Sequence, residues 1–102
     1  MYQIRKTEVF VEWIDRLRDL QGRARILVRI ERLAMGSAGD VKSVGRGVSE
    51  LRIDCGPGYR VYFRKQGEKI IILLAGGDKG TQVRDIKKAI VLSENLKEVN
   101  DD

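Results

Sequence analysis

Arginines recur at alternate positions near the middle of the chain, in a pattern suited to binding an anion. Arg52 stands before a Gly-Pro-Gly turn at residues 56–58, and Arg60 and Arg64 follow it. Alternate residues of a strand share one face, and residues that flank a tight turn become cross-strand neighbours. We therefore expect Arg52 and Arg60 to converge. Two guanidinium groups held together can bind a phosphate through paired hydrogen bonds.

Other polar residues are expected on the same face. Glu50 and Asp54 alternate with Arg52, and Tyr62 follows Arg60 by two positions. The Tyr62 ring offers a surface on which a nucleic-acid base can stack. The alternative is a solvated face on which the arginines pair with neighbouring carboxylates. Both interpretations stay open at this point.

A glycine-rich segment at residues 76–80 is a second candidate anion site. It joins an apolar run to a predicted helix. Consecutive backbone amides at a helix N-terminus bind anions, and Lys79 would add a positive charge. The segment is not a Walker A loop, because the G-x-x-x-x-G-K-[ST] pattern is missing. Glycines that allow a tight strand-to-helix turn are the alternative explanation.

Two features of the composition exclude familiar kinds of site. The chain has no histidine, so no imidazole can act as a general base near neutral pH. Its single cysteine, Cys55, excludes an internal disulfide and a cysteine-based zinc site. Without a histidine to activate it, Cys55 is expected to be a small, partly buried apolar residue.

Length and charge bound the remaining possibilities. The 102 residues are expected to form one domain, and the contents of 42% hydrophobic and 34% charged residues fit a soluble globular protein. A net charge of +5 favours a polyanionic partner, such as nucleic acid, the ribosome or an acidic protein segment. We find no signal peptide and no apolar run of about 20 residues, so a cytoplasmic location away from membranes is the default expectation.

The N-terminal third predicts a short strand followed by two helices. Residues 2–6 form the strand, and Thr7 can cap the first helix. Gly22 is expected to break that helix, and the second helix should end at Met35 and Gly36. Apolar stripes at helical spacing define the buried faces: Phe10, Trp13, Ile14 and Leu17 in the first helix, and Ile26, Leu27, Ile30 and Leu33 in the second.

The rest of the chain predicts a loop, three strands and a last helix. Residues 36–47 are expected to be a flexible connector or, alternatively, a basic lip carrying Lys42 and Arg46. Three strands then form an antiparallel meander, and residues 69–75 are apolar enough to be covered on both faces. Thr81 can cap the last helix, whose acidic tail should fray from about Ser93. Its expected buried stripe is Val83, Ile86, Ala89 and Ile90.

The predicted order is therefore β-α-α-β-β-β-α, an α+β architecture with a mainly antiparallel sheet and the helices packed on one face. Two sequence segments are informative when they are considered together with this predicted order. GVSELRIDCGPGYRVYF and KIIILLAGGDKGTQVRDIKKA resemble the RelE/ParE toxin superfamily and, within it, the phage-related addiction-module killer or HigB-like branch. The resemblance extends over nearly the whole chain.

The resemblance implies a RelE-like fold and a toxin of a type II toxin–antitoxin module. RelE-like toxins cleave messenger RNA in the ribosomal A site without a metal or another cofactor. The substrate 2′-OH attacks the adjacent phosphate and leaves a cyclic phosphate end. Clustered cations can stabilise the developing charge without histidine. The implied partners are the ribosome, messenger RNA and a small cognate antitoxin, expected to be of helix-turn-helix type.

The same resemblance implies roles for individual residues. Arg60 matches the family arginine that stabilises the phosphate, and Arg52 occupies a basic position from which it would orient that phosphate. Lys79 falls near a basic position after the last strand and would stabilise or protonate the leaving oxygen. Glu50 stands where relatives carry a basic residue and is a candidate general base. Further RNA contacts are expected from Lys42, Arg46, Tyr62, Arg64 and Gln82.

Two other activities stay open at the level of sequence. Toxins of the ParE type share this fold but inhibit gyrase and have no ribonuclease activity. A non-enzymatic basic binding module would also account for the charge. Fold alone does not decide among such activities.

Overall fold

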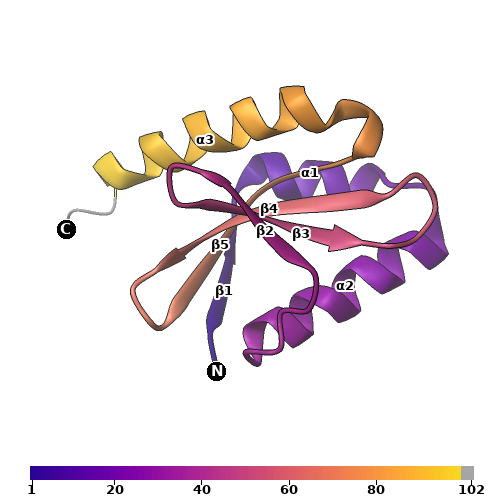
Figure 1. Cartoon of the computed structure of the whole chain (residues 1–102), viewed down its shortest axis with the longest axis horizontal. Coiled ribbons are helices and arrows are strands. Elements are labelled where there is room, and N and C mark those ends of the chain that lie inside the picture. Colours follow the sequence, from indigo (N-terminus) through magenta and orange to yellow (C-terminus); the bar gives the residue numbers. More distant parts are fainter. Residues whose placement is uncertain (100–102) are drawn as a thin grey trace.

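The computed structural model describes residues 1–99 as one five-stranded sheet with three α-helices (Figure 1). The predicted element order is confirmed, with one additional strand. In chain order the elements are β1 (Gln3–Lys6), α1 (Glu8–Arg16), α2 (Leu20–Ala34), β2 (Val41–Gly45), β3 (Val48–Ile53), β4 (Tyr59–Gln66), β5 (Ile70–Asp78), a short 3-10 turn η1 (Lys79–Thr81) and α3 (Gln82–Val99).

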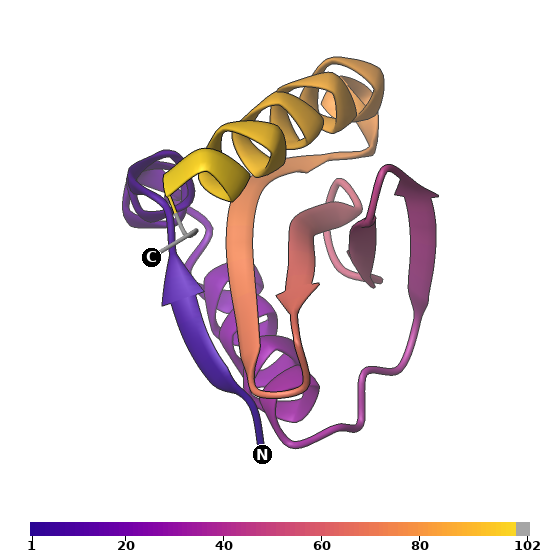
Figure 2. The same cartoon turned by 90° about the vertical axis from the view of Figure 1, so that its left-hand side faces the viewer.

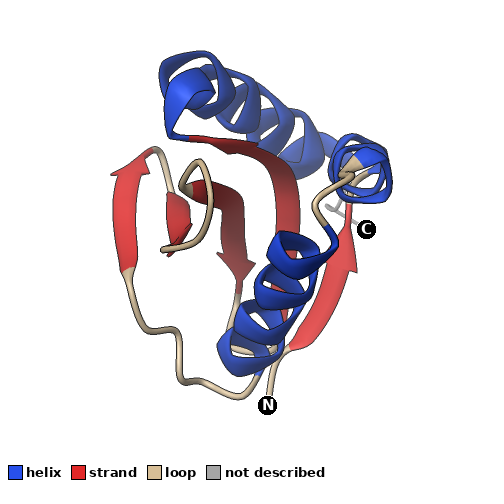
Figure 3. Ribbon diagram, turned by 90° about the vertical axis from the view of Figure 1, so that its right-hand side faces the viewer, coloured by secondary structure: helices blue, strands red, loops and turns tan. Residues whose placement is uncertain are grey.

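The sheet has the strand order β1-β5-β4-β3-β2. The predicted antiparallel meander of β3, β4 and β5 is confirmed, and β1 joins it in parallel beside β5. Figure 3 shows β1 and β2 at opposite edges of the curved sheet. The sheet is thus antiparallel except for the pairing of β1 with β5.

The prediction of a flexible connector at residues 36–47 was wrong for its second half. Val41–Gly45 forms the edge strand β2, which pairs with β3. Gly45, Arg46 and Gly47 all have positive φ values of 104°, 53° and 79°, and they form the tight turn between the two strands. The valines of β2 favour an extended backbone, and pairing with β3 satisfies the backbone hydrogen bonds of β2. Residues 45–47 therefore form a turn between two paired strands and are not part of a long loop.

Helices cover both faces of the sheet, so the prediction that all of them pack on one face was wrong (Figure 2). One core joins α1 and α2 to one face, through residues that include Phe10, Ile26 and Leu51. A second core joins α3 to the other face, through Leu74 and Ala89 among others. Residues of β5 alternate between the two cores, which explains the uninterrupted apolar sequence of that strand.

The break between α1 and α2 lies at residues 17–19 rather than at Gly22. Thr7 caps α1 as predicted, and Asp19 caps α2 by accepting a hydrogen bond from the amide of Gly22 at 3.0 Å. Asp19 also accepts from the Tyr59 hydroxyl at 2.8 Å. Burial, together with this bond, raises the pKa of Tyr59 to about 12, while the Gly22 and Tyr59 bonds hold the pKa of Asp19 below its usual value.

Two residues assigned to buried helical stripes are exposed instead. Leu27 is 41% exposed and Val83 is 70% exposed. Helix α3 continues through Val99, with Ser93 buried, so the predicted fraying does not begin at Ser93. Residues 100–102 of the predicted tail lie outside the described residues. Within residues 1–99, no helix is both long enough and apolar enough to cross a membrane.

Replacing Gly22 by alanine provides a test of the α2 N-terminus. Helix propensity alone predicts that alanine stabilises α2 by about 1 kcal/mol. The structure predicts the opposite sign, because an added Cβ would lie 2.5 Å from both Asp19 Oδ2 and Tyr59 Cε2. We expect Gly22→Ala to lower the free energy of unfolding by about 1–3 kcal/mol in chemical denaturation. The exposed Gln21→Ala variant is the control and should unfold like the wild type.

Candidate functional site

The register of β3 and β4 brings the predicted phosphate-binding arginines together. Arg52 lies directly opposite Arg60 in this antiparallel pair. The expected convergence is therefore confirmed. In the neighbouring row, Glu50 lies opposite Tyr62 on β4 and opposite Lys42 on β2. All of these side chains project from the face of the sheet that also carries α3.

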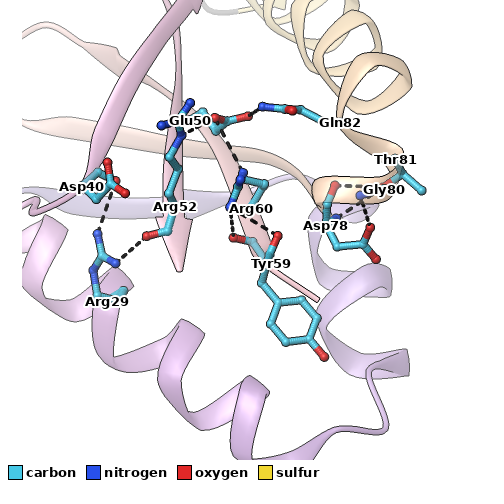
Figure 4. Close-up of polar contacts among 11 residues, drawn as sticks. Arg29, Asp40, Glu50, Arg52, Tyr59, Arg60, Asp78, Gly80, Thr81 and Gln82 are labelled. Carbon is cyan, nitrogen blue, oxygen red and sulfur yellow. Dashed lines mark hydrogen bonds and ion pairs between the residues drawn. The ribbon is translucent and has the colours of Figure 1, made fainter. Parts of the chain in front are cut away.

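The carboxylate of Glu50 is the centre of this group (Figure 4). Its side chain is fully buried, and each oxygen accepts a hydrogen bond: Oε1 from Arg52 Nε at 2.9 Å, and Oε2 from Gln82 Nε2 at 2.8 Å. Arg60 Nε lies 3.7 Å from Oε1. We call Glu50, Arg52, Arg60, Tyr62 and Gln82 the Glu50 cluster. Three elements, β3, β4 and α3, contribute to it.

Two opposing effects act on the pKa of Glu50. Burial alone would raise it, because a charged carboxylate loses its hydration. The hydrogen bonds from Arg52 and Gln82, the nearby Tyr62 hydroxyl and the charge of Arg60 outweigh burial and hold the pKa below its usual value. Glu50 is therefore a charged acceptor rather than a proton carrier near neutral pH.

The cluster has capacity for a further acceptor group. Arg52 and Arg60 contribute two positive charges against one carboxylate, and their side chains are 31% and 13% exposed. Arg60 Nε and the Tyr62 hydroxyl are buried beside the Glu50 carboxylate, so the exposed parts of the two guanidinium groups, and not these atoms, would meet a ligand. Arg60 Nη1 reaches only backbone carbonyls, that of Gly58 at 3.3 Å and that of Tyr59 at 3.4 Å. An anion at this face would balance charge and offer acceptors to the guanidinium groups.

The prediction that Tyr62 stacks on a base was wrong. Its side chain is fully buried in the core beneath α3, so neither face of the ring is available to a ligand. Burial and the adjacent Glu50 charge raise the pKa of its hydroxyl strongly, and it stays protonated. Alternation along β4 correctly predicted the face of Tyr62, but α3 covers that part of the face.

The glycine-rich segment does not form the predicted anion site. Gly76 and Gly77 belong to β5, and the amides that follow are already bonded within the chain. Gly80 donates to the Asp78 carboxylate at 2.8 Å, and Lys79 donates to the Gly58 carbonyl at 2.9 Å. The chain thus supplies its own carboxylate where an external anion was expected. Lys79 is exposed and lies beside the turn that leads into Arg60.

The other predicted RNA-binding residues lie in different places. Lys42 is exposed on β2, across from Glu50. Arg46 and Arg64 are not part of the Glu50 cluster, because both contact the second half of α3. Arg46 pairs with Glu94 at 3.0 Å, and Arg64 Nη1 donates to the Ser93 carbonyl at 2.8 Å. The Arg64 contact is partly buried and links β4 to α3, whereas the Arg46–Glu94 pair is exposed to solvent.

Sequence reasoning missed a second buried carboxylate. Asp85 is 4% exposed and accepts a hydrogen bond from the Thr81 hydroxyl at 2.5 Å. It packs against Gly77 so closely that a Cβ at that position would clash with its carboxylate. The sequence could have indicated this burial, because Asp85 lies four residues before Ala89, an expected buried position, and residues at that spacing share a helix face. Cys55 is partly buried against the core, as expected.

In the part of the chain that the structure describes, no cluster of three or more cysteine, aspartate or glutamate side chains is arranged to hold a metal ion.

Comparisons with known proteins connect this geometry to a family. Residues 12–98 match the family described as "Phage derived protein Gp49-like". An uncharacterised protein of Haemophilus influenzae is 50% identical over 94 residues, which cover 92% of this chain and 95% of that protein. A mutant of the E. coli toxin RelE in the free state has a similar fold, with a TM-score of 0.67 and 17% sequence identity. The match covers 87% of this chain and 94% of that chain.

Removing the charge of Glu50 is the direct test of its structural role. We expect Glu50→Gln to lower the free energy of unfolding at pH 7 by roughly 2–4 kcal/mol, because Arg52 and Arg60 lose their shared counter-charge. The exposed Glu68→Gln variant is the control and should match the wild type.

Acid should erase this difference. The pKa of Glu50 is lower in the folded state than the value of about 4.3 for an unfolded chain. Its contribution to stability is therefore complete above about pH 5, and it is lost as the pH falls through the folded pKa. Denaturation curves at several pH values should show Glu50→Gln and wild type converging in acid. A difference that stays constant down to pH 3 would contradict this assignment.

Proposed function

We propose that this chain, which belongs to the Gp49-like family of phage-derived proteins, is the toxin of a toxin–antitoxin module and cleaves messenger RNA on the ribosome. The Gp49-like family is a RelE/ParE-type toxin family. The family and the RelE-like fold support the toxin assignment. The observation that carries the proposed chemistry is the pair formed by Arg52 and Arg60, held side by side by one buried carboxylate.

The proposed reaction requires no external nucleophile. The 2′-oxygen of the substrate forms a bond to the adjacent phosphorus as solvent takes the proton of the 2′-OH, and the bond to the 5′-oxygen of the next nucleotide breaks. The products are a cyclic phosphate and a 5′-OH that has gained a proton. Negative charge grows on the phosphoryl oxygens in the transition state, where preorganised guanidinium donors are most effective. Arg60 would stabilise this charge, and Arg52 would orient the phosphate.

Lys79 is the proposed partner of the leaving oxygen. It is exposed, and its backbone is bonded to the turn that precedes Arg60. Its ammonium group can stabilise the departing 5′-oxygen or protonate it. Lys42, across the strand pair from Glu50, would contact a flanking phosphate of the RNA.

The surroundings of Glu50 suit a residue that positions the two arginines better than a general base that takes the proton of the 2′-OH. A general base needs a free acceptor oxygen and a pKa near the operating pH. Both oxygens of Glu50 are occupied, the side chain is fully buried and its pKa is lowered. We therefore propose that Glu50 holds Arg52 and Arg60 in place, and that it is not the group that takes the proton of the 2′-OH.

The proposed partners follow from the toxin assignment. Toxins of such modules are neutralised by a cognate antitoxin, which we propose is a small protein of helix-turn-helix type. Because this chain carries a net charge of +5, its antitoxin should present an acidic segment. The affinity of that segment should fall with added salt if charge carries the binding.

Replacing Arg60 tests the catalytic proposal. We expect induced wild-type protein to arrest growth and to produce sharp messenger RNA cuts within codons, detected by mapping RNA 5′ ends. Arg60→Ala should reduce cleavage by at least about 100-fold, the size of effect found for loss of one transition-state donor. Arg18→Ala removes the same charge from an exposed loop position and should keep full activity.

Each alternative activity predicts a different result. Growth arrest with a DNA-damage response but without RNA cuts would identify a gyrase inhibitor. No growth arrest at all would point to a non-enzymatic binding module. Full cleavage by a normally folded Arg60→Ala protein would remove Arg60 from the mechanism.

A further inference from the structure

A groove of about 590 Å³ runs along η1 and the first turns of α3. Three of its lining residues are cations, and none is an acid. We call it the α3 groove. It is lined by Lys79, Gly80, Thr81, Gln82, Val83, Arg84 and Lys87.

The α3 groove is continuous with the Glu50 cluster through one side chain. Gln82 lines the groove, and its Nε2 donates to Glu50 Oε2 at 2.8 Å. Figure 4 shows Gln82 reaching from the start of α3 to Glu50, above Arg52 and Arg60. At the other end of η1, Lys79 lines the groove and is bonded to the turn that precedes Arg60. A ligand lying in the groove would therefore lie next to the arginine pair.

The charge of the α3 groove is not cancelled from within. The nearest carboxylate on α3, Asp85, is buried and accepts a hydrogen bond from Thr81. Arg84 Nε lies 3.5 Å from this carboxylate, yet the Arg84 side chain is 77% exposed. Lys87 follows Arg84 by three positions, so the two side chains are neighbours on the helix surface. Exposed cations next to a carboxylate that turns inward present net positive charge to solvent.

We propose that the α3 groove binds the ribose–phosphate backbone of single-stranded RNA beside the nucleotides held at the arginine pair. The proposal rests on the proposed function, because that function places a phosphodiester at Arg52 and Arg60. Arg84 and Lys87 neutralise phosphates of the same strand, and the exposed Val83, one turn before Lys87, offers an apolar contact beside them. A groove with cations along it and few apolar anchors suits a regularly charged chain better than a folded protein surface.

Binding is measured separately from cleavage by using RNA that cannot react. The probe is a single-stranded RNA of about 12 nucleotides with 2′-O-methyl groups, which block attack by the 2′-oxygen. Its affinity for the full chain is measured at several salt concentrations. For single strands, the slope of log K against log salt changes by about 0.7 for each phosphate contact. We expect Arg84→Gln/Lys87→Gln to flatten the slope by about 1.4 and to weaken binding on the order of tenfold at low salt.

Lys88 provides the matched control. It carries the same charge on the same helix, but it lines only the groove between α1 and α3 and not the α3 groove. Because Arg84 lines both grooves, the matched comparison is between Lys87 and Lys88. Lys87→Gln should flatten the salt slope by about 0.7, whereas Lys88→Gln should leave it close to the wild-type slope. Equal effects of the two substitutions would mean that only net charge matters and would overturn the proposal. Wild-type affinity of the double variant, or no RNA binding by the wild type, would overturn it as well.

The results also separate this proposal from the proposed function. If the protein cleaves no RNA but the double variant binds the probe more weakly with a flatter slope, the groove assignment stands and the nuclease assignment fails. If the wild type cleaves RNA and the double variant binds the probe as the wild type does, the nuclease assignment stands and the groove assignment fails.

Discussion

The buried carboxylate of Glu50 is the constraint around which this structure is arranged. A fully buried charge is costly unless donors surround it. Here the donors come from β3, β4 and the start of α3, so satisfying one carboxylate aligns three elements that are separate in the sequence. The same requirement keeps Arg52 and Arg60 side by side against their mutual repulsion. Removing one partner from such a cluster is costly, because the remaining charges lose their counter-charge.

The arrangement of helices leaves room for this polar group. Because α1 and α2 cover one face of the sheet, that face carries the larger apolar core. Helix α3 covers only part of the other face, where it buries Tyr62 and Leu74. The ends of β3 and β4 beyond that helix carry the arginine pair. One face is therefore divided between a small core and a charged surface, and Tyr62 and Gln82 lie at the boundary between them.

Intramolecular contacts also decide which charges are available to a ligand. Asp78 occupies the amides of the η1 turn, and Arg64 is held by a partly buried contact with α3. Lys79, Arg84 and Lys87 are exposed instead, along one groove that leads to the arginine pair. Counting cations in the sequence gives the sign of the surface. The contacts between elements determine which of those cations are positioned to meet an anion.

Local rules were sufficient for the central features of this protein. Alternation along the strands and the turn at residues 56–58 predicted that Arg52 and Arg60 would converge, because strand period and a tight turn fix the positions of nearby residues. The composition excluded histidine and disulfide chemistry. Tertiary packing decided the rest. Gln82 meets Glu50 across 32 positions of sequence, α3 covers Tyr62, and β2 completes the sheet edge. These contacts depend on which face each helix covers and on which strand finds a partner, and no local periodicity encodes either choice.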